Sequence, residues 1–79
     1  MLQQPVMGQA MYVVCIYNKE VRALVKENQS HAYYEDYWAD TQVRDIVAYD
    51  EDEARSLIEK RFPPEDGFVI EDLSEARYN

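Results

Sequence analysis

The segment Thr41–Leu73 reads TQVRDIVAYDEDEARSLIEKRFPPEDGFVIEDL, the pattern of a strand, a helix and a second strand. We predict that the helix starts after Asp50, an N-cap residue that Glu53 follows three positions later to complete a capping box. The first turn of this helix is acidic and its last turn basic, as the helix dipole favours, and Pro63-Pro64 ends it.

Apolar spacing supports this reading of the segment. Ala54, Leu57 and Ile58 recur at i, i+3 and i+4, so the helix has one apolar stripe. The flanking runs Thr41–Tyr49 and Phe68–Leu73 are rich in β-branched and aromatic residues, and both are predicted strands. One face of the first strand alternates two valines with Asp45, which conflicts with complete burial of that face.

Upstream of this unit, Tyr12–Tyr17 is almost continuously apolar and predicts a central strand. Val21–Glu27 fits two readings. With a period of two, its valines share one face of a strand. With a helical period they form an apolar stripe on a helix whose N-cap would be Asn18. Because the loop after the predicted strand Tyr12–Tyr17 is short, we predict that Val21–Glu27 is a second strand that pairs with it in a hairpin. The alternative is a helix.

The segment His31–Asp40 is dense in aromatic residues, which favour extended structure on a half-buried surface, so it is also predicted to be a strand. Each face of that strand would carry aromatic rings and carboxylates together. Neither face is purely apolar, as a face packed on the core would be, and this makes the segment a candidate for binding.

The expected architecture is α+β, a small antiparallel-rich sheet of four to five strands with one helix packed on one face. Residues 1–10 are predicted to be a flexible lead-in, residues 11–74 a single domain and residues 75–79 a frayed tail. A chain of 79 residues has room for one modest core and a binding face rather than a deep, dry cleft.

The chain carries sixteen acidic and eight basic residues, a formal net charge of −8. That sign disfavours direct binding to nucleic acid or to an anionic membrane, and it permits a basic partner. Cys15 is the only cysteine, which excludes an intrachain disulfide, fits a cytoplasmic protein and suggests a small buried core residue. No apolar run approaches the ~20 residues of a membrane span, and no signal peptide is expected.

No catalytic, cofactor or metal motif stands out, so we predict a protein that is not an enzyme and needs no cofactor. His31 is the only histidine and reads as a turn or exposed residue without a second ligand nearby. Cys15 lacks a neighbouring base. The acids from Asp50 to Glu53 are explained by helix capping, and they lack the central glycine of a calcium loop.

The remaining signal is the mixture of acids and aromatic rings between Glu27 and Glu53, a window with nine acidic residues and one basic residue. Tyrosine and tryptophan are common interface anchors. Acids that alternate along a strand stand ~6.8 Å apart, of the order of phosphate spacing, so a basic channel for nucleic acid would accept such a face. The predicted partner-binding residues are Tyr33, Tyr34, Glu35, Asp36, Tyr37, Trp38, Asp40, Asp45, Asp50, Glu51 and Asp52.

With its acidic-aromatic block His31–Asp40 and its acidic helix start Asp50–Glu53 on a one-helix sheet, the chain resembles the small phage-encoded anti-CRISPR proteins, in particular those directed at type I systems such as type I-C. The resemblance is one of size, charge and layout. It implies a non-enzymatic inhibitor that binds a surveillance complex and blocks its target DNA.

The sequence therefore predicts a monomer or weak homodimer that docks its acidic-aromatic face on a basic, nucleic-acid-handling complex. The alternative is a small accessory module that associates with itself or with another subunit, through exposed aromatic rings on an unprotected strand edge.

Overall fold

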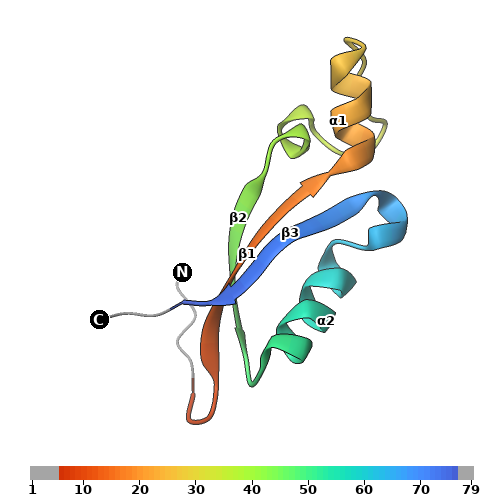
Figure 1. The fold of residues 1–79 in the computed structure, drawn as a ribbon. Coiled ribbons are helices and arrows are strands. Elements are labelled where there is room, and N and C mark those ends of the chain that lie inside the picture. Colours follow the sequence, from red (N-terminus) through yellow and green to blue (C-terminus); the bar gives the residue numbers. More distant parts are fainter. Residues whose placement is uncertain (1–5, 77–79) are drawn as a thin grey trace.

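The computed structural model describes residues 6–76, which form one three-stranded sheet, two α-helices and two short 3₁₀ helices (Figure 1). In chain order the elements are β1 (Ala10–Asn18), α1 (Lys19–Lys26), η1 (Asp36–Ala39), β2 (Gln42–Ala48), α2 (Glu51–Arg61), η2 (Pro64–Asp66) and β3 (Phe68–Glu75). The predicted flexible lead-in and frayed tail fall partly on residues 1–5 and 77–79, which lie outside the described residues.

The long strand β1 lies in the middle of the sheet and pairs antiparallel with β2 on one side and with β3 on the other. Strands β2 and β3 therefore run in the same direction, and α2 connects them across one face. The pairing of β1 with β3 shifts between Cys15 and Ile16, which leaves Glu71 without a partner in the register. Figure 1 shows α1 at one end of the sheet and the corner between β2 and α2 at the other.

One face of the sheet carries the core. Alternate residues of β1 are buried, and Val14 and Ile16 are fully inaccessible to solvent. Helix α2 supplies Ala54 and Ile58 to the same cluster, as its predicted apolar stripe requires. The opposite face, which we call the open sheet face, is not covered by α2 or η1, because both pack on the core side.

The α+β class, the three strands at 12–17, 41–49 and 68–73 and the helix after Asp50 are confirmed. Asp50 caps α2 by accepting a 2.7 Å hydrogen bond from the backbone N–H of Glu53. The Glu53 carboxylate accepts a 2.8 Å hydrogen bond from the backbone N–H of Tyr49. In a capping box this bond would come from the N–H of the N-cap residue Asp50, one position later. Val43, Asp45 and Val47 share the open sheet face, which resolves the conflict in the strand pattern.

The count of four to five strands and one helix is wrong, because two predicted strands are not strands. Val21–Lys26 belongs to helix α1, the alternative reading, and Glu27 is its C-cap; the Asn18 side chain caps the start of the helix, and Val21 is fully buried. His31–Asp40 forms turns and η1 instead of a strand, and it turns Trp38 into the core. Cys15, predicted to be buried, is half-buried on the open sheet face.

Strand β1, helix α1 and η2 meet at the fully buried side chain of Asn18. Its Oδ1 accepts hydrogen bonds from the N–H groups of Glu20 and Val21 at 2.9 and 3.0 Å, and its Nδ2 donates to the carbonyl of Asp66 at 3.0 Å. Gly67 follows with φ near +100°, and a Cβ there would lie 2.8 Å from Asn18 Oδ1. Glycine is therefore required both by its backbone conformation and by the lack of space.

Gly67→Ala is expected to lower the free energy of unfolding by about 2–4 kcal/mol, since it adds left-handed strain to crowding against Asn18. Gly8→Ala is the matched control, because Gly8 also has positive φ but a Cβ there meets Tyr49 only at ordinary contact distance. It is expected to cost only about 1–2 kcal/mol. Urea unfolding of both variants measures the difference, and equal losses would show that the crowding is unimportant.

Candidate functional site

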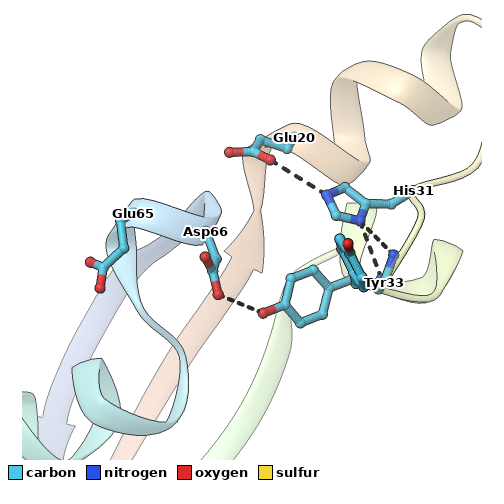
Figure 2. A pocket seen from close by; sticks show the side chains of 6 residues that line it. Glu20, His31, Tyr33, Glu65 and Asp66 are labelled. Carbon is cyan, nitrogen blue, oxygen red and sulfur yellow. Dashed lines mark hydrogen bonds and ion pairs between the residues drawn. The ribbon is translucent and has the colours of Figure 1, made fainter.

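A cavity of about 500 Å³ opens where the first turn of α1, the segment 31–34 and η2 come together (Figure 2). We call it the acidic pocket, and it is lined by Glu20, His31, Tyr33, Tyr34, Glu65 and Asp66. Figure 2 shows Glu20 at the start of α1 facing the imidazole ring of His31, with Asp66 on η2 directed toward the pocket and Glu65 at its outer edge. The pocket thus combines three carboxylates with two phenol rings.

The orientation of His31 fixes its hydrogen-bonding role. Its Nδ1 accepts from the backbone N–H groups of Tyr33 and Tyr34 at 3.0 and 3.3 Å, so the ring hydrogen is on Nε2. That Nε2–H faces Glu20 Oε1 at 3.4 Å. In this form the imidazole is neutral and does not offset the carboxylate charge. His31 lies in an irregular segment, and its side chain is only 13% exposed, so the expectation of an exposed histidine is wrong.

Tyr34 connects the segment 31–34 to η2. Its hydroxyl donates a 2.8 Å hydrogen bond to Asp66 Oδ2, and its ring packs edge-on against Phe68 with 4.9 Å between the centroids. The hydrogen bond to Asp66, together with burial and the negative charges of Asp66 and Glu20, raises the pKa of the Tyr34 phenol above its ordinary value. The hydroxyl therefore stays a donor well into alkaline conditions.

The carboxylates of the pocket lack a cationic partner within residues 6–76. Within the described part of the chain, the contact between Glu20 and His31 at 3.4 Å is the only one between a carboxylate and a basic side chain at ion-pair distance. Three arginines lie over aromatic rings instead: Arg22 over Tyr17 at 3.6 Å, Arg44 over Trp38 at 5.2 Å and Arg61 over Phe62 at 5.8 Å from the ring centroid. Arg22 also donates to the carbonyl of Ala39.

Several sequence-predicted binding residues gather at the α1 end of the molecule and are exposed there. Tyr33 is 87% exposed and Tyr37 is 48% exposed. The exposed acids of the same segment are Glu35, Asp36 and Asp40. Tyr34 is half-buried in the pocket wall.

Trp38, by contrast, is 6% exposed and packs against Phe62 and Phe68, so it is a core residue and not the interface anchor that we predicted. The same burial removes it from the edge-strand version of the self-association hypothesis.

The remaining predicted residues lie elsewhere. Asp45 is on the open sheet face, and Asp50, Glu51 and Asp52 begin α2 at the opposite end of the sheet. The nine residues of β1 that separate the two ends span about 26 Å. The predicted set is therefore divided into two acidic groups, and the phosphate-like spacing proposed for residues 31–40 is wrong because that segment is not a strand.

Sequence reasoning missed the pocket residues Glu20, Glu65 and Asp66, and treated His31 as uninformative. The available signal was the helical alternative for Val21–Glu27, which places Glu20 in the first turn of a helix capped by Asn18.

The open sheet face is a second candidate surface. Val43 is 59% exposed on it. Its other apolar members are half-buried: Met11, Val13, Cys15, Tyr17, Val47 and Val69.

Residues 6–76 contain no group of three or more histidine, cysteine or acidic side chains placed to hold a metal ion. In the same range no helix has the length and apolar character that crossing a bilayer requires. No protein-family model, curated protein or solved structure matches the chain significantly.

Tyr34→Phe is expected to reduce the loss of stability at alkaline pH. Folding raises the pKa of the Tyr34 phenol. The stabilisation that its hydrogen bond to Asp66 provides is therefore fully present below the ordinary pKa of 10.0, and it is lost as pH rises through the pKa that the phenol has in the folded protein. Urea unfolding between about pH 8 and about pH 11 should thus show that the free energy of unfolding falls less for Tyr34→Phe than for wild type. Tyr33→Phe, which alters an exposed phenol, is the control, and identical falls for wild type and Tyr34→Phe would contradict the assignment.

Proposed function

We propose that the protein is a non-catalytic binding protein that docks on a basic, nucleic-acid-binding partner and excludes nucleic acid from it. The observation that carries the proposal is the cluster of carboxylates at the α1 end of the sheet, which lie beside exposed tyrosines and have no cationic partner among residues 6–76. We call this surface the acidic end, and it consists of Glu20, Tyr33, Glu35, Asp36, Tyr37, Asp40, Glu65 and Asp66.

Charge and anchors have different roles in this proposal. The carboxylates raise the rate of encounter with a basic surface and suppress binding to acidic ones. Tyr33 and Tyr37 provide contact area at low cost in side-chain entropy, since each has few rotatable bonds. The resemblance to small phage inhibitors makes a type I CRISPR surveillance complex a candidate partner of this class, with target DNA as the ligand that is excluded.

The acidic end is expected to bind more weakly as salt rises, and Asp36→Lys should lower affinity roughly tenfold, because it places a like charge against a basic surface. The measurement is recovery of a basic complex from bacterial lysate on tagged protein at low and high salt, followed by binding of the purified complex and its DNA. A salt-insensitive affinity would count against the proposal.

Asp52→Lys is the matched control, because it makes the same change in charge at the far end of the sheet. Its effect should be smaller than that of Asp36→Lys after both variants are shown to be folded. Equal effects would mean that net charge, and not the acidic end, governs binding.

A second candidate function is self-association, and the apolar character of the open sheet face favours it. Two such faces from different copies would remove Val43 and its half-buried neighbours from water, as in the packing of one sheet on another. This version of the hypothesis uses the face of the sheet and does not require Trp38.

If the open sheet face forms a homodimer, Val43→Lys should raise the dimer dissociation constant at least about tenfold, because it buries a charge in the interface. Ser56→Lys introduces the same charge at an exposed position of α2 and should leave association unchanged. Sedimentation velocity over a concentration series makes the measurement. A wild-type protein that stays monomeric throughout would eliminate this candidate.

A further inference from the structure

We propose that the acidic pocket receives the side chain of an arginine from the basic partner, an inference that rests on the proposed function and locates its specificity. The pocket is a cavity with aromatic walls, and this separates it from the other acidic stretches of the surface. Its carboxylates come from two elements, α1 and η2, which both line the same cavity.

Each pocket carboxylate leaves an acceptor unused. Glu20 offers one oxygen to His31, and Asp66 offers Oδ2 to Tyr34, while no hydrogen bond within residues 6–76 occupies the second oxygen of either group. Glu65 is exposed at the rim of the same cavity. Since a guanidinium has five N–H donors in a fixed plane, it can donate to more than one carboxylate at once.

The aromatic walls favour arginine over lysine. A guanidinium is flat, weakly hydrated and stacks on rings, whereas an ammonium is a compact and strongly hydrated charge. The protein's own Arg22 is an example, because its guanidinium lies 3.6 Å from the centroid of the Tyr17 ring and forms no ion pair within residues 6–76. Tyr33 and Tyr34 offer comparable ring surfaces to an incoming side chain.

The pocket is formed before any ligand arrives. The bond from Tyr34 to Asp66 fixes one wall, and the two backbone hydrogen bonds to His31 fix another. Asn18 holds the backbones of Glu20 and Asp66 against each other through its buried side chain. Binding therefore requires little free energy to order the acidic pocket, which suits recognition of a single side chain.

The probe for this proposal is the peptide acetyl-Gly-Arg-Gly-amide, titrated into ¹⁵N-labelled protein at low salt. Its citrulline analogue keeps the shape and removes the charge, and its lysine analogue keeps the charge and removes the plane. The arginine peptide should shift the amide signals of Glu20, Tyr34 and Asp66, with at least tenfold tighter binding than the citrulline peptide and tighter binding than the lysine peptide.

The variant that tests the site is the double substitution Glu20→Gln with Asp66→Asn. It should lose the response to the arginine peptide. The control pair Glu59→Gln with Asp72→Asn removes the same charge from exposed positions outside the pocket, and it should retain the response. Because Asp66→Asn also changes the partner of Tyr34, the unfolding curves of both double variants are compared to establish that each is folded.

Equal binding of the arginine and citrulline peptides, or shifts confined to residues outside the pocket, would overturn the inference. Equal losses in the two double variants would overturn it as well. These results leave the proposed function intact, because the salt dependence of partner binding and the effect of Asp36→Lys are measured separately. Failure of that partner test, with a pocket that still selects arginine, would overturn the proposed function alone.

Discussion

The hydrogen bonds of the buried Asn18 side chain are the interaction on which the α1 end of this molecule depends. A buried amide must satisfy its hydrogen-bonding groups inside the protein, and Asn18 does so with three backbone groups from two elements. Its acceptor starts α1, and its donor holds η2 at the end of β1. Because the bonded backbone groups belong to Glu20 and Asp66, the contact that caps a helix also brings together two carboxylates that are 46 positions apart in the chain.

The second constraint is how the few basic residues are used. Arginines that stack on Tyr17, Trp38 and Phe62 cover aromatic surface with their apolar stems and planar heads. They contribute to packing, but they do not neutralise the acids within residues 6–76. The surface consequently keeps a negative excess at both ends of the sheet, which costs self-repulsion and favours encounter with basic molecules.

The parts of the fold that were predictable from sequence are those decided by local chemistry. Asp50 and Glu53 locate the start of α2 because capping acts within one turn, and the apolar run of β1 identifies a central strand. Val21–Glu27 fits both periods, and contacts outside the segment decide between them, since Asn18 needs the carbonyl of Asp66 to be fully bonded. The pocket was not predictable, because the pairing of Asn18 with Phe68 in the register of β1 and β3 creates it.

The segment His31–Asp40 shows why aromatic content alone misled the prediction. Aromatic residues favour strands because they pack well on a pleated surface, but that preference needs a neighbouring strand with an unpaired edge. Here Trp38 packs in a cluster with Phe62 and Phe68, and η1 turns it inward while Tyr33 and Tyr37 remain exposed.

The two acidic groups also differ in what their charges do for the fold. Asp50 uses its carboxylate to cap α2, and the acids beside it offset the positive end of the helix dipole, so their presence is explained without a partner. In the acidic pocket, Glu20 and Asp66 each accept one side-chain hydrogen bond, and no hydrogen bond within residues 6–76 uses their second carboxylate oxygens. The acids at the start of α2 thus have an explanation in the fold, and the proposed recognition is located at the α1 end because carboxylates lie beside exposed tyrosines there.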